Sequence, residues 1–410
     1  MSFETISVIG LGYIGLPTAA VFASRKKKVI GVDVNKKAVD TINRGEIHIV
    51  EPDLDMIVHA AVAEGYLKAV TTPEPADAFL IAVPTPFKDD HEPDLGYIES
   101  ASKAIAPVLK KGDLVILEST SPVGATEQMA AWMAEARPDL SFPQTLGEDS
   151  DIRVAHCPER VLPGHVLREL VQNDRVIGGM TRKCSDMAAT LYKSFVEADC
   201  VITDARTAEM CKLTENSFRD VNIAFANELS IICDKLDINV WELIRLANRH
   251  PRVNILQPGP GVGGHCIAVD PWFIVAKAPE CSELIRTART VNDLKPAWVV
   301  NKVLETIGSG RHKEIIFYGL SFKADIDDFR ESPALHIARD IIKLVKDGVD
   351  IYVVEPNVTN TDDFKEFVFI KLKEALQKNG LHVLLVDHKE FKGIYPDGEI
   401  IDTKGIWCRA

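Results

Sequence analysis

The 410-residue sequence predicts two α/β domains joined by a helical region. Over the first ~200 residues, short apolar runs alternate with amphipathic stretches, which is typical of a parallel sheet covered by helices. From Thr207 to about Leu236 the sequence contains few helix breakers, and after residue 314 the short apolar runs return. We therefore expect domains at residues 1–200, 201–305 and 306–410, with a sheet in the first and in the last.

The individual elements follow from the same patterns. In the first domain we expect strands at Thr5–Ile9, Val29–Val32, Ala78–Val83, Leu114–Leu117 and Val154–His156. The central region is expected to hold long helices at Thr207–Leu236 and Glu283–Thr306. In the last domain the expected strands are Ile315–Tyr318, Ile351–Val354, Phe367–Ile370 and Val383–Val386. The central helices either supply a homodimer face, which is our expectation, or pack within one chain.

Composition excludes several classes of partner. The formal charge of −13 argues against nucleic-acid and anionic-membrane partners, so any phosphate site has to be locally basic. The eight cysteines show no CxxC pair and no metal-ligand spacing, which predicts reduced thiols and no metal site. The sequence opens without a signal-peptide pattern and has no apolar stretch of membrane-spanning length. We expect a cytoplasmic protein without membrane insertion.

A dinucleotide fingerprint follows the first strand. Gly10-Leu-Gly-Tyr-Ile-Gly15 places Gly10 at the turn, Gly12 against the pyrophosphate and Gly15 at the helix–sheet contact. Asp33 ends the next strand, where a carboxylate binds the ribose hydroxyls of NAD and repels the 2′-phosphate of NADP. The fold class is therefore an N-terminal Rossmann-like domain, a central helical connector and a second Rossmann-like α/β domain, with NAD as cofactor. Lys36 and Lys37 lie close by in the sequence, so NADP remains an alternative cofactor.

Two further loops stand at strand ends, where ligands collect in such sheets. Val83-Pro-Thr-Pro86 follows the third strand and Glu118-Ser-Thr-Ser-Pro-Val-Gly124 follows the fourth. Either is also consistent with ordinary turn chemistry. Their positions nevertheless make Thr85 and Thr120 candidates for contact with cofactor or substrate.

Cys266 lies in a glycine-dense run, Pro258–Pro271. Cysteine often fills a core, but the sequence Gly-Gly-His-Cys is poor core material. A thiolate here adds to an aldehyde, and the thiohemiacetal then loses a second hydride to give a thioester. Asp270 either orients a group or activates water, or it merely starts a helix.

Other polar residues support an oxidation site. Lys212, Asn216 and Arg219 share one helix face, and a lysine there exchanges a proton with a substrate oxygen or stabilises an alkoxide. Glu159, after another strand, is a candidate base for thioester hydrolysis. The alternative for each is a solvated surface position.

Basic residues near the C-terminal half mark a possible anion site. Lys323 and Arg330 flank a strand–helix crevice, and His250 and Arg252 precede the glycine run. A basic surface loop is the alternative for the second pair.

Together these motifs resemble the UDP-glucose/GDP-mannose 6-dehydrogenase family over nearly the whole chain. The matching segments, in order, are Gly10-x-Gly-x-x-Gly15, Val83-Pro-Thr-Pro86, Glu118-Ser-Thr-Ser-Pro-Val-Gly124, Pro158-Glu-Arg160, Lys212-x-x-x-Asn216, Gly263-Gly-His-Cys266-x-x-x-Asp270, and Phe322-Lys323 with Arg330-Glu-Ser332. The resemblance implies a four-electron oxidation of a nucleotide-sugar C6 alcohol to a carboxylate, with NAD and a cysteine thioester.

The resemblance also implies roles for residues that spacing alone does not assign. The implied catalytic residues are Cys266, Lys212, Asn216, Glu159, Asp270 and Thr120. The implied NAD contacts are Gly10, Gly12, Tyr13, Ile14, Gly15, Asp33, Thr85, Thr126 and Arg330. The implied UDP-sugar contacts are Arg160, Val161, Lys212, Asn216, Arg219, His250, Arg252, Gly263, Lys323 and Ala324.

Within the family, the run His250–Ile255 and His265 before the cysteine resemble members that oxidise UDP-N-acetyl-D-mannosamine for bacterial surface polysaccharide. UDP-N-acetylglucosamine and UDP-glucose remain alternative substrates. Two other classes also stay open: a two-electron hydroxyacid dehydrogenase, which needs no Cys266, and a nucleotide-binding protein without catalysis.

Overall fold

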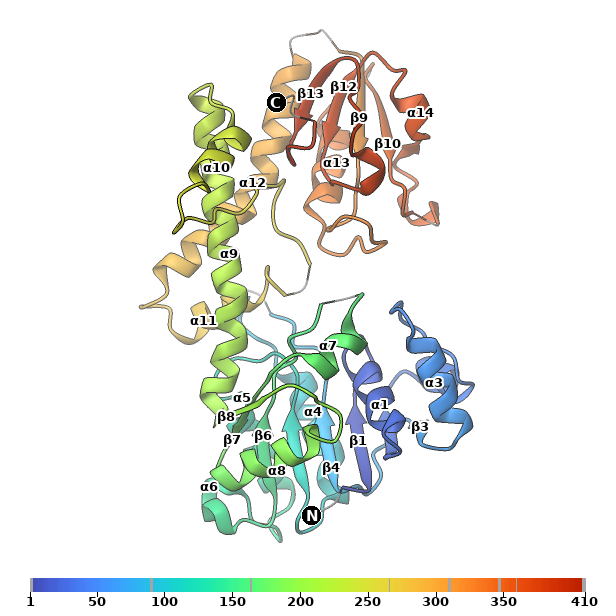
Figure 1. The fold of residues 1–410 in the computed structure, drawn as a ribbon, viewed down its shortest axis with the longest axis vertical. Helices are drawn as coiled ribbons and strands as arrows, with labels where there is room; N and C mark the ends of the chain where they lie inside the picture. The colour runs from blue at the N-terminus through green and yellow to red at the C-terminus, as the bar shows by residue number, and fades with distance from the viewer. Residues whose placement is uncertain are drawn as a thin grey trace. The chain divides into compact units, whose positions relative to one another are not determined.

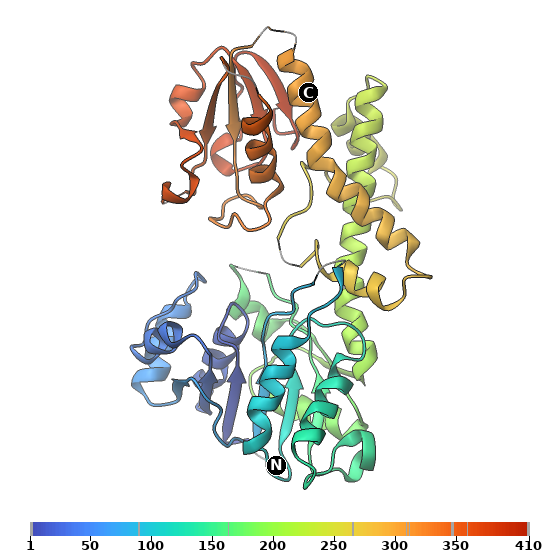
Figure 2. The ribbon, with the colours of Figure 1, turned by 180° about the vertical axis from the view of Figure 1, so that it is seen from behind.

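The computed structural model describes residues 3–88, 91–162, 164–264, 266–308, 310, 312–345, 348–358 and 360–407. The chain divides into two compact units, Met1–Glu215 and Asn216–Ala410, whose elements are labelled in Figure 1 and seen from behind in Figure 2. Each unit contains a sheet, as the alternating apolar runs predict. The expected boundaries at residues 200 and 305 stay a prediction.

The described part of the first unit has an eight-stranded sheet in the order β3-β2-β1-β4-β5-β6-β7-β8. The strands are β1 (Thr5–Ile9), β2 (Lys28–Val32), β3 (Leu67–Val70), β4 (Ala78–Ile81), β5 (Leu114–Leu117), β6 (Arg153–His156), β7 (Arg175–Gly179) and β8 (Cys200–Asp204). Neighbouring strands are parallel except β6 and β7, which are antiparallel. Strands β1, β2, β4, β5 and β6 were predicted, whereas β3, β7 and β8 were not.

The α-helices of the first unit cover both faces of this sheet. They are α1 (Gly15–Ser24), α2 (Lys36–Asn43), α3 (Leu54–Ala63), α4 (Gly96–Ile105), α5 (Ala125–Ala136), α6 (Pro143–Leu146), α7 (Val166–Gln172) and α8 (Arg182–Tyr192). One core contains Val8 with residues of α1, α3, α7 and α8, and the other contains Ile9 with residues of α4 and α5. Successive residues of β1 thus enter opposite cores, because strand side chains alternate.

A long helix, α9 (Ala205–Lys235), leads from the first unit into the second. The second unit continues with α10 (Val240–Ala247), α11 (Asp270–Lys277), α12 (Glu283–Gly308), β9 (Glu314–Tyr318), α13 (Pro333–Leu344), β10 (Asp350–Val354), β11 (Val368–Phe369), α14 (Leu372–Ala375), β12 (Leu381–Leu384) and β13 (Glu399–Asp402). The two long helices begin and end within two residues of the predicted bounds.

The sheet of the second unit is parallel, in the order β11-β10-β9-β12-β13. The chain winds one way from β9 to β11 and the other way through β12 and β13, so the direction reverses between β9 and β12. Such a reversal leaves a crevice at the carboxyl ends of the strands. No helix in the described ranges is long and apolar enough to cross a membrane.

Candidate active site

The Gly10–Gly15 turn has the shape that a bound pyrophosphate needs. Gly10 has a φ of +90°, and a Cβ there would lie 2.5 Å from the carbonyl oxygen of Ala82. A Cβ at Gly15 would lie 1.7 Å from the carbonyl oxygen of Gly10, so the first residue of α1 packs directly on the turn. At Gly12 a Cβ would meet no described atom within 4 Å. The middle glycine therefore leaves space in front of the turn, which fits NAD.

Asp33 lies directly after β2 and is tied to the same turn. Its Oδ2 accepts a hydrogen bond from Leu11 N at 2.9 Å, and its Oδ1 accepts one from Asn35 N at 2.8 Å. The side chain is half-buried, as is that of Ile14, whereas Tyr13 is exposed. The carboxylate thus stands beside the glycine turn, where the sequence predicts the adenosine ribose.

The two strand-end loops meet each other. Thr85 Oγ1 donates to the carbonyl oxygen of Thr120 at 2.6 Å, which joins the loops after β4 and β5. Thr126, by contrast, is fully buried in the first turn of α5, and its Oγ1 donates to Glu209 Oε1 at 2.6 Å. Glu209 also accepts from Gly124 N and so caps this helix. Contact of Thr85, Thr120 and Thr126 with NAD stays a prediction.

Glu159 belongs to a buried group of charges at the strand ends. Its Oε2 accepts from Arg175 Nη1 at 2.8 Å, and its Oε1 accepts from Arg160 N at 2.7 Å. Nearby, Glu118 accepts from Tyr192 Oη at 2.6 Å. Burial raises the pKa of Glu118 to about 7, against the charge of Arg175, which lowers it. The two carboxylates therefore differ in environment: Glu159 is held by an arginine, whereas Glu118 has a pKa of about 7 and is only partly ionised at neutral pH.

The helical triad Lys212, Asn216 and Arg219 lies on α9 as predicted. Along this face, Lys212 is half-buried, Asn216 is buried and Arg219 is exposed. Asn216 Nδ2 donates to Oδ2 of Asp270 at 2.5 Å, and Asp270 is itself buried at the start of α11. The structure thus joins two predicted site residues that stand 54 positions apart.

The glycine run packs against the loop that follows β9. A Cβ at Gly263 would lie 2.5 Å from the carbonyl oxygen of Glu331, and one at Gly264 would lie 3.1 Å from the ring of Phe322. Only glycine permits this approach without displacing its neighbours. The loop of Cys266 and the loop of Lys323 are therefore adjacent within the second unit.

Cys266 itself is exposed at the end of this run, and its carbonyl oxygen accepts from Asp270 N at 2.9 Å. Cys157, Cys184 and Cys233 are buried, as expected for core cysteines. His265, singled out in the sequence, lies outside the described residues.

Polar side chains of the long helices anchor the other end of the glycine run. Gly259 N donates to Asn227 Oδ1 at 2.9 Å, and Asn227 Nδ2 donates to Asn292 Oδ1 at 2.9 Å. Asn292 in turn donates to Asp220 Oδ1 at 2.8 Å. Helix α9 therefore holds the run at Gly259 through Asn227 and reaches Asp270 through Asn216.

The remaining candidates occupy separate positions. Arg160 forms an ion pair with Glu215, at 2.8 Å between Nη2 and Oε1, and Val161 beside it is half-buried. His250 and Arg252 are exposed in a loop closed by hydrogen bonds between Asn248 and Ile255. These ligand contacts stay predictions.

In the last domain, Lys323 is exposed and Ala324 is half-buried. Arg330 is exposed and pairs with Asp328, at 2.5 Å between Nη2 and Oδ2. The contacts assigned to these residues also stay predictions.

Sequence reasoning missed several residues that shape the site. Arg175, Tyr192 and Glu209 hold predicted residues in place, and their partners lie 16, 74 and 83 positions away. His388 was also missed, although it lies under the Lys323 loop. The one available signal was a charged or polar residue in an otherwise apolar run, as at Arg175.

Three segments match the UDP-glucose/GDP-mannose dehydrogenase family: its NAD binding domain at residues 4–196, its central domain at 206–294 and its UDP binding domain at 316–408. A UDP-N-acetyl-D-mannosamine dehydrogenase of Yersinia pestis is 67% identical, over 99% of this chain and 100% of the relative. An NDP-N-acetyl-D-galactosaminuronic acid dehydrogenase of Ralstonia solanacearum is 64% identical, over 99% and 97%.

The fold is likewise that of a solved UDP-D-ManNAc dehydrogenase from Pyrococcus horikoshii. That structure superposes with a TM-score of 0.88 at 38% identity, over 99% of this chain and 96% of the other. The cofactor is NAD, bound by the N-terminal domain, as the open glycine turn and Asp33 predict. The chain belongs to the UDP-glucose/GDP-mannose dehydrogenase family and is an NAD-dependent nucleotide-sugar dehydrogenase.

Proposed function

We propose that this enzyme oxidises C6 of UDP-N-acetyl-D-mannosamine from alcohol to carboxylate through a thioester on Cys266. The observation that supports the chemistry is the packing of Gly263 and Gly264, which precede Cys266 by three and two residues, on the loop that contains Lys323. The similarity to dehydrogenases named for this substrate supports the choice of sugar. The uronate product would serve surface polysaccharide synthesis.

The side chains divide the work as follows. NAD held at the Gly10–Gly15 turn and Asp33 would supply the hydride acceptor for each of the two oxidations at C6. Lys212 takes the hydroxyl proton of the substrate or stabilises the alkoxide. Cys266 Sγ adds to the aldehyde carbon, and the resulting thiohemiacetal is oxidised to a thioester. Water then displaces the sulfur and leaves the carboxylate, while the thiol of Cys266 is restored.

The choice of base for hydrolysis follows from the hydrogen bonds. Both oxygens of Glu159 already accept, from Arg175 and from Arg160 N. This arrangement suits a carboxylate that holds the strand-end loop in place. Asp270 stands four residues from Cys266 and is oriented by Asn216. We therefore favour Asp270 over Glu159 as the group that orients the attacking water.

A second substrate also has support. A relative named NDP-N-acetyl-D-galactosaminuronic acid dehydrogenase is nearly as similar to this chain as one named for UDP-N-acetyl-D-mannosamine. UDP-N-acetylgalactosamine therefore belongs beside UDP-N-acetylglucosamine and UDP-glucose among the alternatives.

The deciding experiment incubates the purified enzyme with NAD and each of these UDP-sugars, and counts NADH and product. We expect two NADH per UDP-N-acetylmannosamine, with a uronate product and no released aldehyde. Cys266→Ser should lower turnover by about 10⁴-fold or more, with NAD affinity retained. Release of free aldehyde with one NADH from the wild type would remove the thioester mechanism, and preference for another sugar would replace the proposed substrate.

We also propose that the enzyme is a homodimer assembled through α9. Phe218, Phe225 and Ile232 follow one another at seven-residue intervals on this helix and are 69%, 57% and 44% exposed. Such a stripe of large apolar side chains is typical of an interface between helices.

Light scattering tests this assembly. Phe225→Asp should halve the mass of the particle, whereas Met56→Asp, a change at an exposed apolar residue of α3, should leave it unchanged. A monomeric wild type would contradict the dimer.

A further inference from the structure

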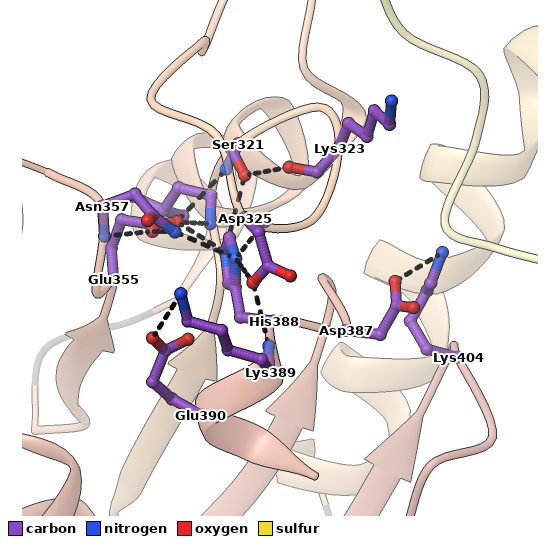
Figure 3. Close-up of polar contacts among 11 residues, drawn as sticks. Ser321, Lys323, Asp325, Glu355, Asn357, Asp387, His388, Lys389, Glu390 and Lys404 are labelled. Carbon is purple, nitrogen blue, oxygen red and sulfur yellow. Dashed lines mark hydrogen bonds and ion pairs between the residues drawn. The ribbon is translucent and has the colours of Figure 1, made fainter. Parts of the chain in front are cut away.

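The loop that carries Lys323 rests on a buried histidine (Figure 3). His388 follows β12 and has a fully buried side chain. Its Nδ1 lies 2.9 Å from Asp325 N and 3.0 Å from Asn357 Nδ2. Both of these groups donate hydrogen bonds, so Nδ1 acts as the acceptor and the ring proton is on Nε2. The hydrogen bonds thus specify one tautomer of His388.

The other ring nitrogen faces a buried carboxylate. Nε2 of His388 donates to Glu355 Oε2 at 3.2 Å, and both side chains are 0% exposed. Glu355 Oε2 also accepts from Leu320 N at 2.7 Å. Burial raises the pKa of Glu355, but its hydrogen bonds with His388 and with the backbone N–H groups of Leu320 and Asn357 lower the pKa further, so the net pKa lies below its ordinary value. Glu355 is therefore an ionised acceptor that holds His388 in place.

The segment that His388 supports has an unusual backbone. Asp325 has a φ of +63°, in the left-handed region that side chains other than glycine seldom adopt. Its amide donates to His388 Nδ1, and its Oδ1 accepts from Lys389 N at 2.9 Å. A conformation of this kind costs about 1 kcal/mol or more and persists only when its surroundings hold it. His388 and Lys389 supply that support from the loop after β12.

The neighbouring residues transmit this support to Lys323. Ser321 Oγ donates to the carbonyl oxygen of Lys323 at 2.7 Å, and Ser321 N contacts Glu355 Oε2 at 3.3 Å. The Lys323 ammonium extends away from the cluster in Figure 3 and is exposed. Lys323 is thus fixed at its backbone from both sides, while its charged end is available to an anion.

We infer that His388 is a positioning residue for the nucleotide: its Nδ1 holds the Asp325 amide and thereby the loop that presents Lys323 to the diphosphate of UDP. The inference rests on the proposed function, in which Lys323 contacts UDP. His388 is buried, so it acts through the loop and does not touch the ligand. Lys323 would bind the diphosphate of UDP equally well in the ground state and in the transition state of the oxidation. Loss of this interaction should therefore raise KM for the UDP-sugar and leave kcat nearly unchanged.

Two conservative variants separate the ring nitrogens of His388. An asparagine oxygen lies near the position of Nδ1 and still accepts from Asp325 N, whereas a glutamine amide reaches the position of Nε2 and bonds only to Glu355. His388→Asn should therefore bind UDP within about threefold of the wild type. His388→Gln and His388→Ala should bind it at least about tenfold more weakly, equivalent to ~1.4 kcal/mol.

The measurement is calorimetric titration of the full-length enzyme with UDP alone, together with steady-state KM and kcat for the UDP-sugar. His382→Asn is the matched control: His382 is also fully buried, in β12, but it contacts Tyr318 Oη and the carbonyl oxygen of Lys378 and not the Lys323 loop. This control should lower stability without changing UDP affinity.

Three outcomes would overturn the inference. Equal UDP affinity in the wild type and in His388→Ala would show that the loop needs no such support. Equal affinity in His388→Asn and His388→Gln would remove the role of Nδ1, and this comparison remains available if His388→Ala does not fold. If the wild type binds NAD but not UDP, the proposed function itself is wrong. If the wild type binds UDP and the His388 variants bind it equally well, only the role of His388 is wrong.

Discussion

Two turns of this chain have the same backbone design and different surroundings. After β1, Gly10 has a φ of +90° and Leu11 N donates to Asp33 at 2.9 Å. After β9, Gly319 has a φ of +87° and Leu320 N donates to Glu355 at 2.7 Å. In each domain a left-handed glycine turns the chain out of the first strand, and an acidic residue after the neighbouring strand holds the next amide.

The two turns differ in what stands in front of them. In the first, the space at Gly12 is empty of described atoms and Asp33 is half-exposed. In the second, Ser321 takes the place of the middle glycine, Ala324 takes that of the third, and His388 covers Glu355. The same turn is therefore open to a ligand in one domain and closed by polar side chains in the other. In the closed domain, the proposed ligand contact is the exposed Lys323, which lies between Ser321 and Ala324.

The sharpest test of this contrast exchanges the third residue of each turn. Gly15→Ala places a Cβ 1.7 Å from the carbonyl oxygen of Gly10, so the turn has to move. We expect NAD binding to weaken by at least about 1,000-fold, equivalent to ~4.1 kcal/mol. Ala324→Gly, at the matching position, should change UDP binding by less than about threefold, which is ~0.7 kcal/mol. Calorimetric titration with each ligand measures both.

If Gly15→Ala binds NAD within tenfold of the wild-type affinity, the first turn tolerates an alanine at its third position, as the second turn does at Ala324. The contrast between an open and a closed turn would then not explain which domain binds NAD.

The next test compares the two acidic residues. Glu355→Ala leaves buried donors at Leu320 N and His388 without an acceptor, and we expect it to destabilise its domain by about 3 kcal/mol. Asp33→Ala affects a half-exposed group, so about 1 kcal/mol is expected. Hydrogen exchange at the amides of Leu320 and Leu11 measures the local stability of each turn separately. Equal loss of protection at the two amides would contradict the distinction between a closed and an open turn.

The sequence predicted the interior of the fold better than its edges. Strands β1 and β5 match their predicted ranges because buried strands read as continuous apolar runs. Strands β3, β8 and β13 were missed because they lie at or near sheet edges, where buried and exposed residues mix. The reversed strand β7 was missed as well, since Arg175 and its glycines do not resemble a strand.

For the candidate site, the sequence predicted the local motifs but not the hydrogen bonds that connect residues far apart in the chain. The glycine turn, the strand-end loops and the Cys266 run are local motifs, and each could be read from adjacent residues. The bonds of Asn216 to Asp270 and of Thr126 to Glu209 connect residues 54 and 83 positions apart. Only the packed fold specifies such pairs, so the burial of Thr126 could not be read from the neighbouring Glu118–Gly124 loop.

Buried carboxylates in the two domains should also respond to pH in opposite directions. The pKa of Glu355 lies below its ordinary value of 4.5, so its contribution to stability is complete above about pH 4.5 and is lost as the pH falls through the folded pKa. Burial raises the pKa of Glu118 to about 7, so the first domain should lose stability as the pH rises from 4.5 to 7. Denaturation from pH 3.5 to 8 measures both trends, and Glu355→Gln and Glu118→Gln should each flatten one of them. A single trend shared by both domains would contradict this assignment.

The smallest expected effect concerns what the open turn recognises. Asp33 stands beside the Gly10–Gly12 turn with room in front of it, so its carboxylate should accept hydrogen bonds from the ribose of NAD and repel the 2′-phosphate of NADP. Asp33→Ser removes that repulsion and leaves Lys36 and Lys37 nearby to attract the phosphate. The ratio of kcat/KM for NAD to that for NADP should fall at least about tenfold, equivalent to ~1.4 kcal/mol. Steady-state kinetics with both cofactors measure the ratio. If it is unchanged in a folded variant, Asp33 holds Leu11 N alone, and the first turn then resembles the second in using its acidic residue only to fix the backbone.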